Sequence, residues 1–570
     1  MNRPPPRTPV LVVGSGPCGL VLSLELGRRG VPAVIIDRKP GTAVNPQANA
    51  TQARTMEYYR RLGFANEIRS LGLPGDYPPD IAYFTRYTGH ELARFSLPSS
   101  QQAAAAARSS TGSWSTPELP HRVSQKFVEQ VLRRHAEAVP GNALHYGWQL
   151  NSFEESADAV TAEVEHVETG QLCTVTADYL IGADGARSTV RNQLGVRYGG
   201  ETGVTRDFFG GKMVAVYLRA PGFYDAMPHP RSWMYWAFNR ERRGWLAAVN
   251  GRDEFAFHTQ LKPGEDQTDL SPERGRALFL QAFGRELDVE VLAIDTWIAG
   301  HALVADSFGQ GRVYIAGDAA HLFTPAGGLG YNTAVEDALN LGWKLAATIK
   351  GTAGPMLMQS FALERRKVAI RNTGYARQFA NEIGNFIPDA DIERDGPEGE
   401  IARGEAGAYL DDYIRREFNI PGITFGTRYD GSPVVVSDGA PIPDDAANRY
   451  APSAVPGGRA PHLWLDDGRS LYDAFGFDWS LLVMSSADSA QTAARAFAEA
   501  AQALDLAIEI VDLSAQEEAR SLYEADLAIV RPDQIVAWRG SGDDIDPNAL
   551  FRVLTGHASA ETPKAKVNVL

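Results

Sequence analysis

The stretch from Val10 to Asp37, VLVVGSGPCGLVLSLELGRRGVPAVIID, constrains the fold of this chain more than any other. It opens with an apolar, β-branched run, which is typical of a buried strand. Glycines at positions 14, 16 and 19 then turn the chain into an apolar helix, and a second apolar run, Ala33–Ile36, ends at Asp37. Strand, glycine turn, helix and strand in this order predict a βαβ unit that binds a dinucleotide.

Each glycine of this turn has its own physical reason. Gly14 allows the tight turn, Gly16 lets the backbone approach a pyrophosphate, and Gly19 lets helix and strand pack closely. The helix N-terminus offers free N–H groups to phosphates. Asp37 lies where an acidic side chain can bind ribose hydroxyls. The alternative is an ordinary glycine turn in an α/β core, but the flanking strands, the helix and the acid all agree with the first reading.

Composition excludes several classes of partner and site. The formal net charge of −15 argues against nucleic acid or an anionic membrane surface as a partner. Cys18 and Cys173 are the only cysteines, which gives neither a disulfide framework nor a zinc site and fits a reducing cytoplasm. We expect no metal, no signal peptide in the proline-rich N-terminus, and no membrane span, because no apolar run reaches about 18 residues.

The rest of the chain alternates between two kinds of pattern. Aromatic-rich alternation between residues 200 and 298 predicts an antiparallel sheet inserted into the α/β part. An Ala/Ser-rich stretch, 101–115, predicts a mobile surface loop. A buried strand at 311–317, a glycine-rich loop and a helix over 332–349 return to the α/β pattern. From residue 462 the strand–helix order suits a small thioredoxin-like domain, in which the lack of Cys-x-x-Cys excludes thiol redox chemistry.

Two further motifs identify a family. The first is Asp184-Gly185 within YLIGADGARSTVR, and the second is Gly317-Asp318 within GRVYIAGDAAHLFTPAGGLGYNTAVEDALNLGWKLA. With the N-terminal fingerprint, they resemble the three signatures of class A flavoprotein monooxygenases, the single-component aromatic hydroxylases, over most of residues 8–380. The C-terminal part resembles the thioredoxin-like appendage of the branch that holds phenol hydroxylase, dichlorophenol monooxygenase and the aromatic polyketide hydroxylases, and Phe425–Val435 resembles its connector.

The resemblance implies an α/β fold: a Rossmann-like, glutathione-reductase-like FAD-binding domain, an inserted antiparallel-sheet substrate domain and a C-terminal thioredoxin-like domain. The expected segments are FAD-binding at 1–75, 116–199 and 301–387, substrate domain at 76–115 and 200–300, a linker at 388–461, and the thioredoxin-like domain without Cys-x-x-Cys at 462–570.

The resemblance also implies FAD as cofactor. Asp318 is placed to accept a ribityl hydroxyl, although an acid there could also cap a turn. The loop from Pro325 to Gly330 suits close approach to a flat ring, and the positive end of the following helix would face that ring. The expected cofactor-binding residues are Gly14, Ser15, Gly16, Pro17, Gly19, Asp37, Arg38, Arg54, Arg122, Gln125, Asp184, Gly317, Asp318, Pro325, Gly328, Gly330 and Asn332.

Some of these residue roles, which only the resemblance implies, have a purely structural alternative. Arg122 and Gln125 resemble an Arg-x-x-Gln pair near the flavin and its phosphates, and the alternative is that they are solvated residues at a helix start. Arg54 resembles an arginine near the cofactor, with a similar alternative. Arg187 could serve a turn rather than a ligand. The chain departs from the family at Pro46-Gln47-Ala48, where relatives often carry Pro-Arg-Ala.

The implied activity is hydroxylation of a phenolic or other electron-rich aromatic compound, with NAD(P)H and O2 as co-substrates and a flavin C4a-hydroperoxide as the oxygen donor. No separate nucleotide fold for NAD(P)H is present, because Tyr314 takes the third glycine position after Gly309-x-Gly311. Catalytic residues remain unassigned. The candidates for the substrate pocket are Asn49, Tyr235, Trp236 and Pro325, and an aromatic on such a strand is often plain core.

Two other functions stay open at this point. A flavin-dependent halogenase would share the scaffold, but the Trp233-Met-Tyr-Trp236 stretch does not match the Trp-x-Trp-x-Ile-Pro signature of that class. A non-catalytic FAD-binding protein would keep the cofactor motifs. We expect a cytoplasmic protein that forms a homodimer through its extra domain, and the sequence ranks none of His229, His258 and His301 as a site residue.

Overall fold

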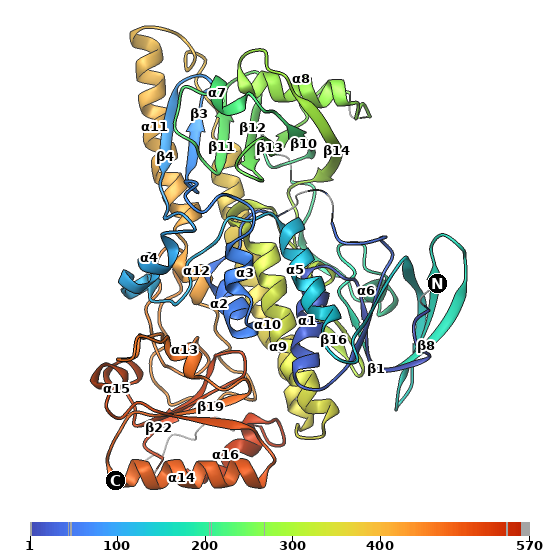
Figure 1. Cartoon of the computed structure of the whole chain (residues 1–570), viewed down its shortest axis with the longest axis vertical. Helices are drawn as coiled ribbons and strands as arrows, with labels where there is room; N and C mark the ends of the chain where they lie inside the picture. Colours follow the sequence, from blue (N-terminus) through green and yellow to red (C-terminus); the bar gives the residue numbers. More distant parts are fainter. Residues whose placement is uncertain are drawn as a thin grey trace, which may run out of the picture.

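The computed structural model of the chain describes residues 3–43, 45, 48–204, 206, 208–266, 268–542 and 545–559, so the departure at Pro46-Gln47 lies outside the described residues. Its strands form sheets of eight, seven, three and four strands. In Figure 1 the seven-stranded sheet lies at the top, the four-stranded sheet at the bottom, and a group of helices between them. The predicted α/β fold class is confirmed, while the domain boundaries stay predictions.

The eight-stranded sheet brings the three motifs to one edge. Its order includes β17-β8-β1-β2, four parallel strands with β1 (Arg7–Val13) beside β2 (Ala33–Asp37). The strand ends are in register, because Val13 pairs with both Ile36 and Gly182, and Gly182 pairs with Ile315. The turns after β1, β8 (Leu172–Gly182) and β17 (Val313–Ile315) therefore start side by side, where open α/β sheets bind their ligands.

The glycine turn has the geometry that the sequence predicts. The φ angle of Gly14 is +108°, and a Cβ there would lie 2.2 Å from the carbonyl oxygen of Ala183. A Cβ on Gly19 would lie 2.0 Å from the carbonyl oxygen of Gly14, so only glycine lets helix α1 (Pro17–Arg28) sit this close to the turn. Helix α1 in turn packs against α5 (Gln125–Glu137) and α9 (Leu329–Ile349).

The seven-stranded sheet has the order β14-β10-β13-β12-β11-β3-β4. All its neighbours are antiparallel except β11 and β3, which run parallel. Two of its strands come from the segment before residue 100, as the expected division of the substrate domain implies. The strands are β3 (Ile81–Phe84), β4 (Glu91–Phe95), β10 (Lys212–Arg219), β11 (Met234–Phe238), β12 (Arg243–Ala248), β13 (Glu254–Gln260) and β14 (Glu290–Ile298).

The predicted loop at 101–115 was wrong. The segment forms helix α4 (Ala103–Ser109) and a short 3-10 turn, Gly112–Trp114. Alanine has the highest helix propensity of all residues, and Ala103 and Ala107, one turn apart, are both buried. The turn is fixed by Trp114, whose Nε1 donates to Oδ1 of Asn419 at 2.9 Å.

The segment predicted to be a linker, 388–461, is helical in its first half. Residues in this segment form α11 (Pro397–Phe418), a 22-residue helix, and then α12 (Pro421–Phe425). Helix α11 has Pro397 at its first position, acidic residues in its first turn and arginines in its last, which all favour a helix. It packs along β4 and against α10 (Pro355–Asn385).

The C-terminal sheet has the order β20-β19-β21-β22, with only β19 and β20 parallel. Its elements are β19 (Trp479–Val483), α14 (Asp488–Ala503), β20 (Ile508–Asp512), α15 (Glu517–Tyr523), β21 (Leu527–Val530), β22 (Val536–Gly540) and α16 (Pro547–Leu554). The order from β19 to β22 agrees with the strand–helix order expected from residue 462, and α16 is an additional helix.

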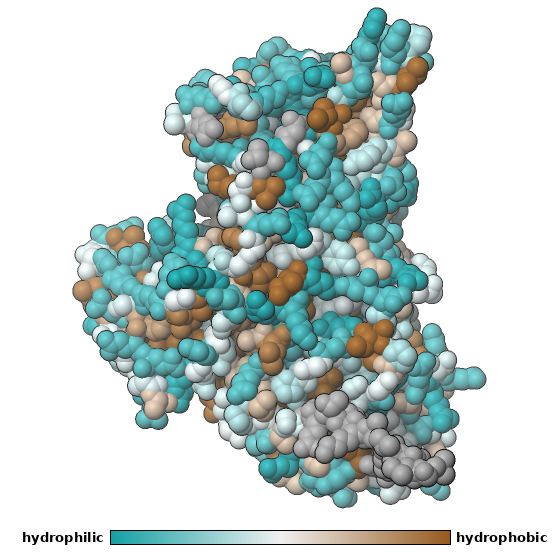
Figure 2. Space-filling model, turned by 180° about the vertical axis from the view of Figure 1, so that it is seen from behind, coloured by the Kyte–Doolittle hydropathy of each residue, from teal (hydrophilic) through white to brown (hydrophobic). Residues whose placement is uncertain are grey.

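Apolar side chains on the face shown in Figure 2 are scattered. Figure 2 shows, on the face opposite to that of Figure 1, apolar residues as separate small patches among polar ones, which is ordinary for a folded protein. Within the described residues, no helix combines the length and the apolar character that crossing a membrane would need.

Candidate functional site

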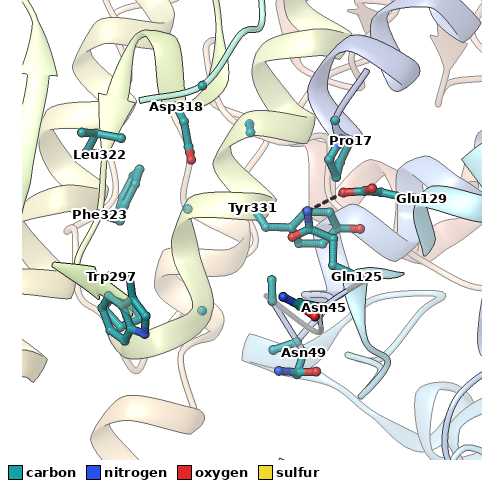
Figure 3. Close-up of a pocket in the computed structure, with 18 of the residues that line it drawn as sticks. Pro17, Asn45, Asn49, Gln125, Glu129, Trp297, Asp318, Leu322, Phe323 and Tyr331 are labelled. Atoms are coloured by element: carbon teal, nitrogen blue, oxygen red, sulfur yellow. Dashed lines mark hydrogen bonds between the residues drawn. The ribbon is translucent and has the colours of Figure 1, made fainter. Parts of the chain in front are cut away.

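One cavity of about 740 Å³ joins the edge of the eight-stranded sheet to the face of the seven-stranded sheet. Gly14 and Asp318, 304 residues apart in the chain, both line it. Figure 3 shows Asp318 and Trp297 on one side of it, and Pro17, Gln125 and Asn49 on the other. The predicted residues that line this cavity are Gly14, Gly16, Pro17, Asp37, Arg38, Asn49, Arg122, Gln125, Asp184, Trp236, Asp318, Pro325, Gly328 and Gly330.

The first end of the cavity is formed by the turn before α1. A Cβ built on Gly16 meets no protein atom within 4 Å, so the backbone there is open toward a ligand. The carboxylate of Asp37 lines the same end and accepts hydrogen bonds from the backbone N–H and the hydroxyl of Ser15, both at 2.8 Å. Arg38 and Lys39 lie beside it. An open helix N-terminus with two cations nearby suits a diphosphate.

Asp318 follows the buried strand β17 and points into the cavity (Figure 3). Its carboxylate makes no hydrogen bond with any described residue, and its exposed surface faces the cavity. Burial within the surrounding protein raises the pKa of this carboxyl, His321 lowers it, and Asp337 raises it further. A carboxylate without a partner inside the protein indicates a ligand with hydroxyl groups.

The turn that carries Asp318 is held from helix α9. The buried carboxylate of Asp337 accepts hydrogen bonds from the backbone N–H of Gly317 at 3.0 Å and from Nε2 of His321 at 2.6 Å. It also accepts one from Nε of Arg365 at 2.7 Å. His321 thus serves as a hydrogen-bonding residue of this turn, and Gly317 lies behind the cavity surface rather than on it.

The glycine loop before α9 forms the floor of the cavity. Gly327 and Gly328 have φ angles of +71° and +62°, which favour glycine. The helix begins at Leu329, three residues before the predicted Asn332, so Leu329, Gly330 and Tyr331 present the first turn to the cavity.

Asn332 itself lies behind the lining. Its Oδ1 accepts hydrogen bonds from the backbone N–H of Gln52 at 2.8 Å and from the hydroxyl of Thr55 at 2.7 Å. Its Nδ2 donates to the carbonyl oxygens of Ala50 and Gly328. Asn332 therefore fixes the position of the loop.

A residue that sequence analysis missed supports the same loop. Oε1 of Glu417, at the end of α11, accepts a hydrogen bond from the backbone N–H of Gly327 at 2.9 Å. The side chain is buried and lines the cavity. Burial raises the pKa of Glu417 to about 7, although the Gly327 N–H and the Tyr413 hydroxyl lower it, and Glu382 adds a further raising effect. No local sequence signal pointed to this residue, because its segment was predicted to be a linker.

An aromatic row crosses the face of the seven-stranded sheet. The register pairs Tyr83 with Trp236, Trp236 with Trp245, and Trp245 with His258. Neighbouring rings in this row lie 5.4, 5.6 and 4.4 Å apart between centroids. Cross-strand partners project from the same face of a sheet, which explains the row. We call its cavity-lining part, with Trp297, the aromatic wall: Trp236, Trp245, His258 and Trp297.

His258 is a neutral hydrogen-bond donor in this wall. Nε1 of Trp297 donates to its Nδ1 at 3.3 Å, which leaves the hydrogen of the imidazole on Nε2. Burial lowers the pKa of His258 to about 4. His229 binds the carbonyl oxygen of Gly89 and His301 binds Thr202, both away from the cavity, so the structure singles out His258 among the three.

Two predicted residues do not reach the cavity. Tyr235 neighbours Trp236 on a strand, so its side chain points to the opposite face, where its hydroxyl accepts from the backbone N–H of Ser232 at 2.7 Å. Arg54 is buried elsewhere and donates to Glu57 and to Gln534, both at 2.7 Å. Its guanidinium ties helix α2 (Ala53–Leu62) to the C-terminal domain instead of a cofactor.

Ser15 and Gly19 also lie outside the lining, although Ser15 holds Asp37 and Gly19 allows the close packing of α1. Gln125 lines the cavity with its side-chain amide donating to Oε1 of Glu129 at 2.7 Å (Figure 3). Asp184 uses Oδ2 to accept from the backbone N–H groups of Thr189 and Val190, while its buried Oδ1 has no partner among the described residues.

The donor set fits FAD. The open backbone at Gly16 suits a diphosphate, the unpartnered carboxylate of Asp318 suits a polyol, and the glycine loop with the N-terminus of α9 suits a flat ring that carries negative charge. The aromatic wall then leaves an apolar space for a second, aromatic ligand.

Comparison with known proteins agrees with this assignment. Residues 7–375 match the family described as FAD binding domain, and residues 453–558 match the family described as aromatic-ring hydroxylase, C-terminal. The chain is 30% identical to the FAD-dependent monooxygenase apdD of Emericella nidulans, over 93% of this chain and 87% of the relative. It is 28% identical to phenol 2-monooxygenase of a Pseudomonas species, over 98% and 94%. A solved structure of chromopyrrolic acid-soaked RebC with bound 7-carboxy-K252c is 33% identical, with a TM-score of 0.86, over 97% of this chain and 100% of that one.

Proposed function

This chain belongs to the FAD-dependent aromatic-ring monooxygenases, and from that premise we propose that it hydroxylates a phenolic or other electron-rich aromatic compound within the cavity described above. It is a flavoprotein enzyme with FAD as its cofactor and NAD(P)H as its co-substrate. The overall reaction consumes one NAD(P)H, one O2 and one proton, places one oxygen atom on the ring as a hydroxyl, and releases the other as water. FAD supplies the transfer of electrons to O2 when it is bound.

The residues of this chain would bind FAD, orient the substrate and shield the reacting groups from water. The turn at Gly14 and Gly16 would hold the diphosphate, and Asp318 would hold the hydroxyls of the ribityl chain. The first turn of α9 would favour negative charge on the flavin ring, since the N–H groups of a helix start carry partial positive charge. Glu417 keeps the glycine loop in place by accepting the Gly327 N–H.

The aromatic wall would hold the substrate ring. Its indole and imidazole rings offer apolar faces for stacking, and Nε2–H of His258 offers one donor to a substrate oxygen. A wall of four rings excludes water from the reacting ring, which protects the activated oxygen. We propose an extended, polycyclic aromatic compound as substrate, because a single small ring would leave most of this wall uncovered.

The single observation that carries the proposal is the convergence of the Gly14 turn, Asp318 and the aromatic wall on one cavity. The test is NAD(P)H oxidation by the FAD-loaded protein, with and without a panel of mono- and polycyclic phenols under 18O2. We expect ligand-stimulated oxidation and one 18O atom in the product. A product that forms only with chloride would support the halogenase alternative, and bound FAD without turnover would support a binding protein.

Two further expectations remain proposals. We place the protein in the cytoplasm, because both its cysteines are buried and unpaired and because its co-substrate is a pyridine nucleotide. The predicted homodimer is supported only by the extra C-terminal domain, and the mass of the purified protein in solution tests it.

A further inference from the structure

Arg122 is a buried cation without a counter-ion. The residue is only 8% exposed, and its side chain makes no hydrogen bond or ion pair with any described residue. Its guanidinium instead lies over the ring of Trp233, 4.5 Å from the centroid. Burial lowers the pKa of Arg122 to about 10, so the group stays charged near neutral pH. An unpaired charge in the interior is costly unless a ligand completes it.

Arg122 stands at the junction of two cavities. A second cavity of about 260 Å³ adjoins the first, and Pro120, Arg122 and Phe418 line both. Its other walls are mostly apolar and include Leu73, Tyr77, Phe95, Leu97, Trp114 and Leu119. None of the residues of the Gly14 turn lines this second cavity. Arg122 thus belongs to an apolar, aromatic end of the site.

The position argues against a phosphate of the cofactor as the anion. The diphosphate end of the main cavity has its own cations, Arg38 and Lys39, and the N-terminus of α1. Arg122 lies instead against Trp233, the residue that leads into strand β11 and its wall residue Trp236. A guanidinium presents paired N–H donors that match the two oxygens of a carboxylate.

We propose that Arg122 binds a carboxylate carried by the aromatic substrate, and that the second cavity receives the part of the substrate next to that carboxylate. The proposal deepens the proposed function and rests on it for the identity of the ligand as substrate. It departs from the role near the flavin that the family resemblance implied for Arg122.

The test compares two matched probes on the FAD-loaded protein. 2-Naphthoate carries the carboxylate, and 2-naphthamide has the same shape without the charge. Binding is followed by the change in the flavin absorption spectrum. We expect the wild-type protein to bind 2-naphthoate at least tenfold more tightly than 2-naphthamide. Arg122→Met should reduce that ratio to about one, leave the binding of 2-naphthamide unchanged, and retain the full content of FAD.

Arg133→Met is the control, because Arg133 lies on α5 with a partly exposed side chain that pairs with Glu137 and lies over the ring of Tyr146, and it lines neither cavity. It should keep the wild-type preference. The proposal is overturned if the wild-type protein shows no preference for the carboxylate, or if Arg122→Met keeps that preference. Loss of FAD in Arg122→Met would assign the residue to the cofactor and would also overturn it. Absence of turnover with every aromatic compound, with the preference intact, would contradict the proposed function and leave the carboxylate site standing.

Discussion

At the scale of single residues, Gly14 and Gly16 belong to one turn but meet different constraints. A methyl group on Gly14 would strike the carbonyl of Ala183, whereas one on Gly16 would enter open space. We therefore expect Gly14→Ala to destabilise the protein by about 2 kcal/mol or more. Gly16→Ala should leave the unfolding free energy of the apoprotein within about 0.5 kcal/mol but weaken FAD binding at least tenfold, or about 1.4 kcal/mol.

Chemical denaturation of the apoproteins and FAD titration separate the two effects. Gly41→Ala is the matched control, since its added methyl group also meets no atom and Gly41 lies outside the cavity. Full FAD affinity in Gly16→Ala would contradict the placement of the diphosphate at this turn.

The buried carboxyl of Glu417 should make the stability of the protein depend on pH. Its pKa in the folded protein is about 7, against an ordinary value of 4.5, because burial disfavours the carboxylate. Between these values the unfolded chain loses the proton while the folded chain keeps it, so stability falls as pH rises. Glu417→Gln keeps the acceptor for Gly327 and removes the titration. The variant should gain up to about 3 kcal/mol relative to wild type between pH 4.5 and pH 8, measured by urea unfolding. An equal difference at both pH values would refute the assignment.

At the scale of elements, helix α9 holds the turn that follows β17. Asp337 on this helix accepts from the Gly317 N–H, from His321 and from Arg365, all in the interior. We expect Asp337→Asn to lower the unfolding free energy by about 3 kcal/mol, because it removes the negative charge that pairs with the buried guanidinium of Arg365. FAD affinity should fall as well, since the position of Asp318 depends on this turn. Thermal unfolding and FAD titration measure both effects.

Glu398→Gln serves as the control for that change. It removes one charge from the exposed first turn of α11 and touches neither the turn nor the cavity, so stability should stay within about 0.5 kcal/mol. Unchanged FAD affinity in Asp337→Asn would show that α9 does not position the Asp318 turn.

The elements themselves were largely predictable, because their signals are local. The glycine turn, the apolar runs of β1 and β2 and the ends of α1 all depend on residues close in the chain. The features that the sequence did not predict depend on contacts between residues that are far apart in the chain. Glu417 reaches Gly327 from 90 residues away, and Arg54 reaches Gln534 from 480 residues away. The aromatic wall depends on the register of four strands, which alternation within one strand cannot supply.

At the scale of the whole molecule, the C-terminal domain is tied to the rest through buried charges. Arg531 donates to Glu364 of α10 at 2.7 Å. Arg459, which lies within the matched segment 453–558, donates to Glu57 of α2 at 2.5 Å. Such ion pairs fix the position of the C-terminal domain against the rest of the chain, because separating them would leave a buried charge without its partner. We therefore expect the chain to unfold in a single transition, with release of FAD and loss of the C-terminal domain at the same temperature.

Arg531→Met tests this coupling. It leaves Glu364 with Lys344 as its remaining cation, and should lower the stability of the whole chain by about 3 kcal/mol without splitting the transition. Arg520→Met, which removes an exposed pair with Asp526 in the same domain, should change stability by less than about 1 kcal/mol. Calorimetry together with flavin fluorescence measures both. Two separate transitions in the wild-type protein would refute the coupling.

The aromatic wall should also make the tryptophan fluorescence of the protein sensitive to ligand binding in the cavity. Three of the ten tryptophans of the chain, at 236, 245 and 297, line the cavity that we propose for FAD and the substrate. We therefore expect tryptophan emission to fall when FAD binds, through energy transfer to the flavin, and to change again when an aromatic ligand packs on the indoles. A search for the natural substrate can therefore follow tryptophan fluorescence during a titration, without a label on the protein or the ligand.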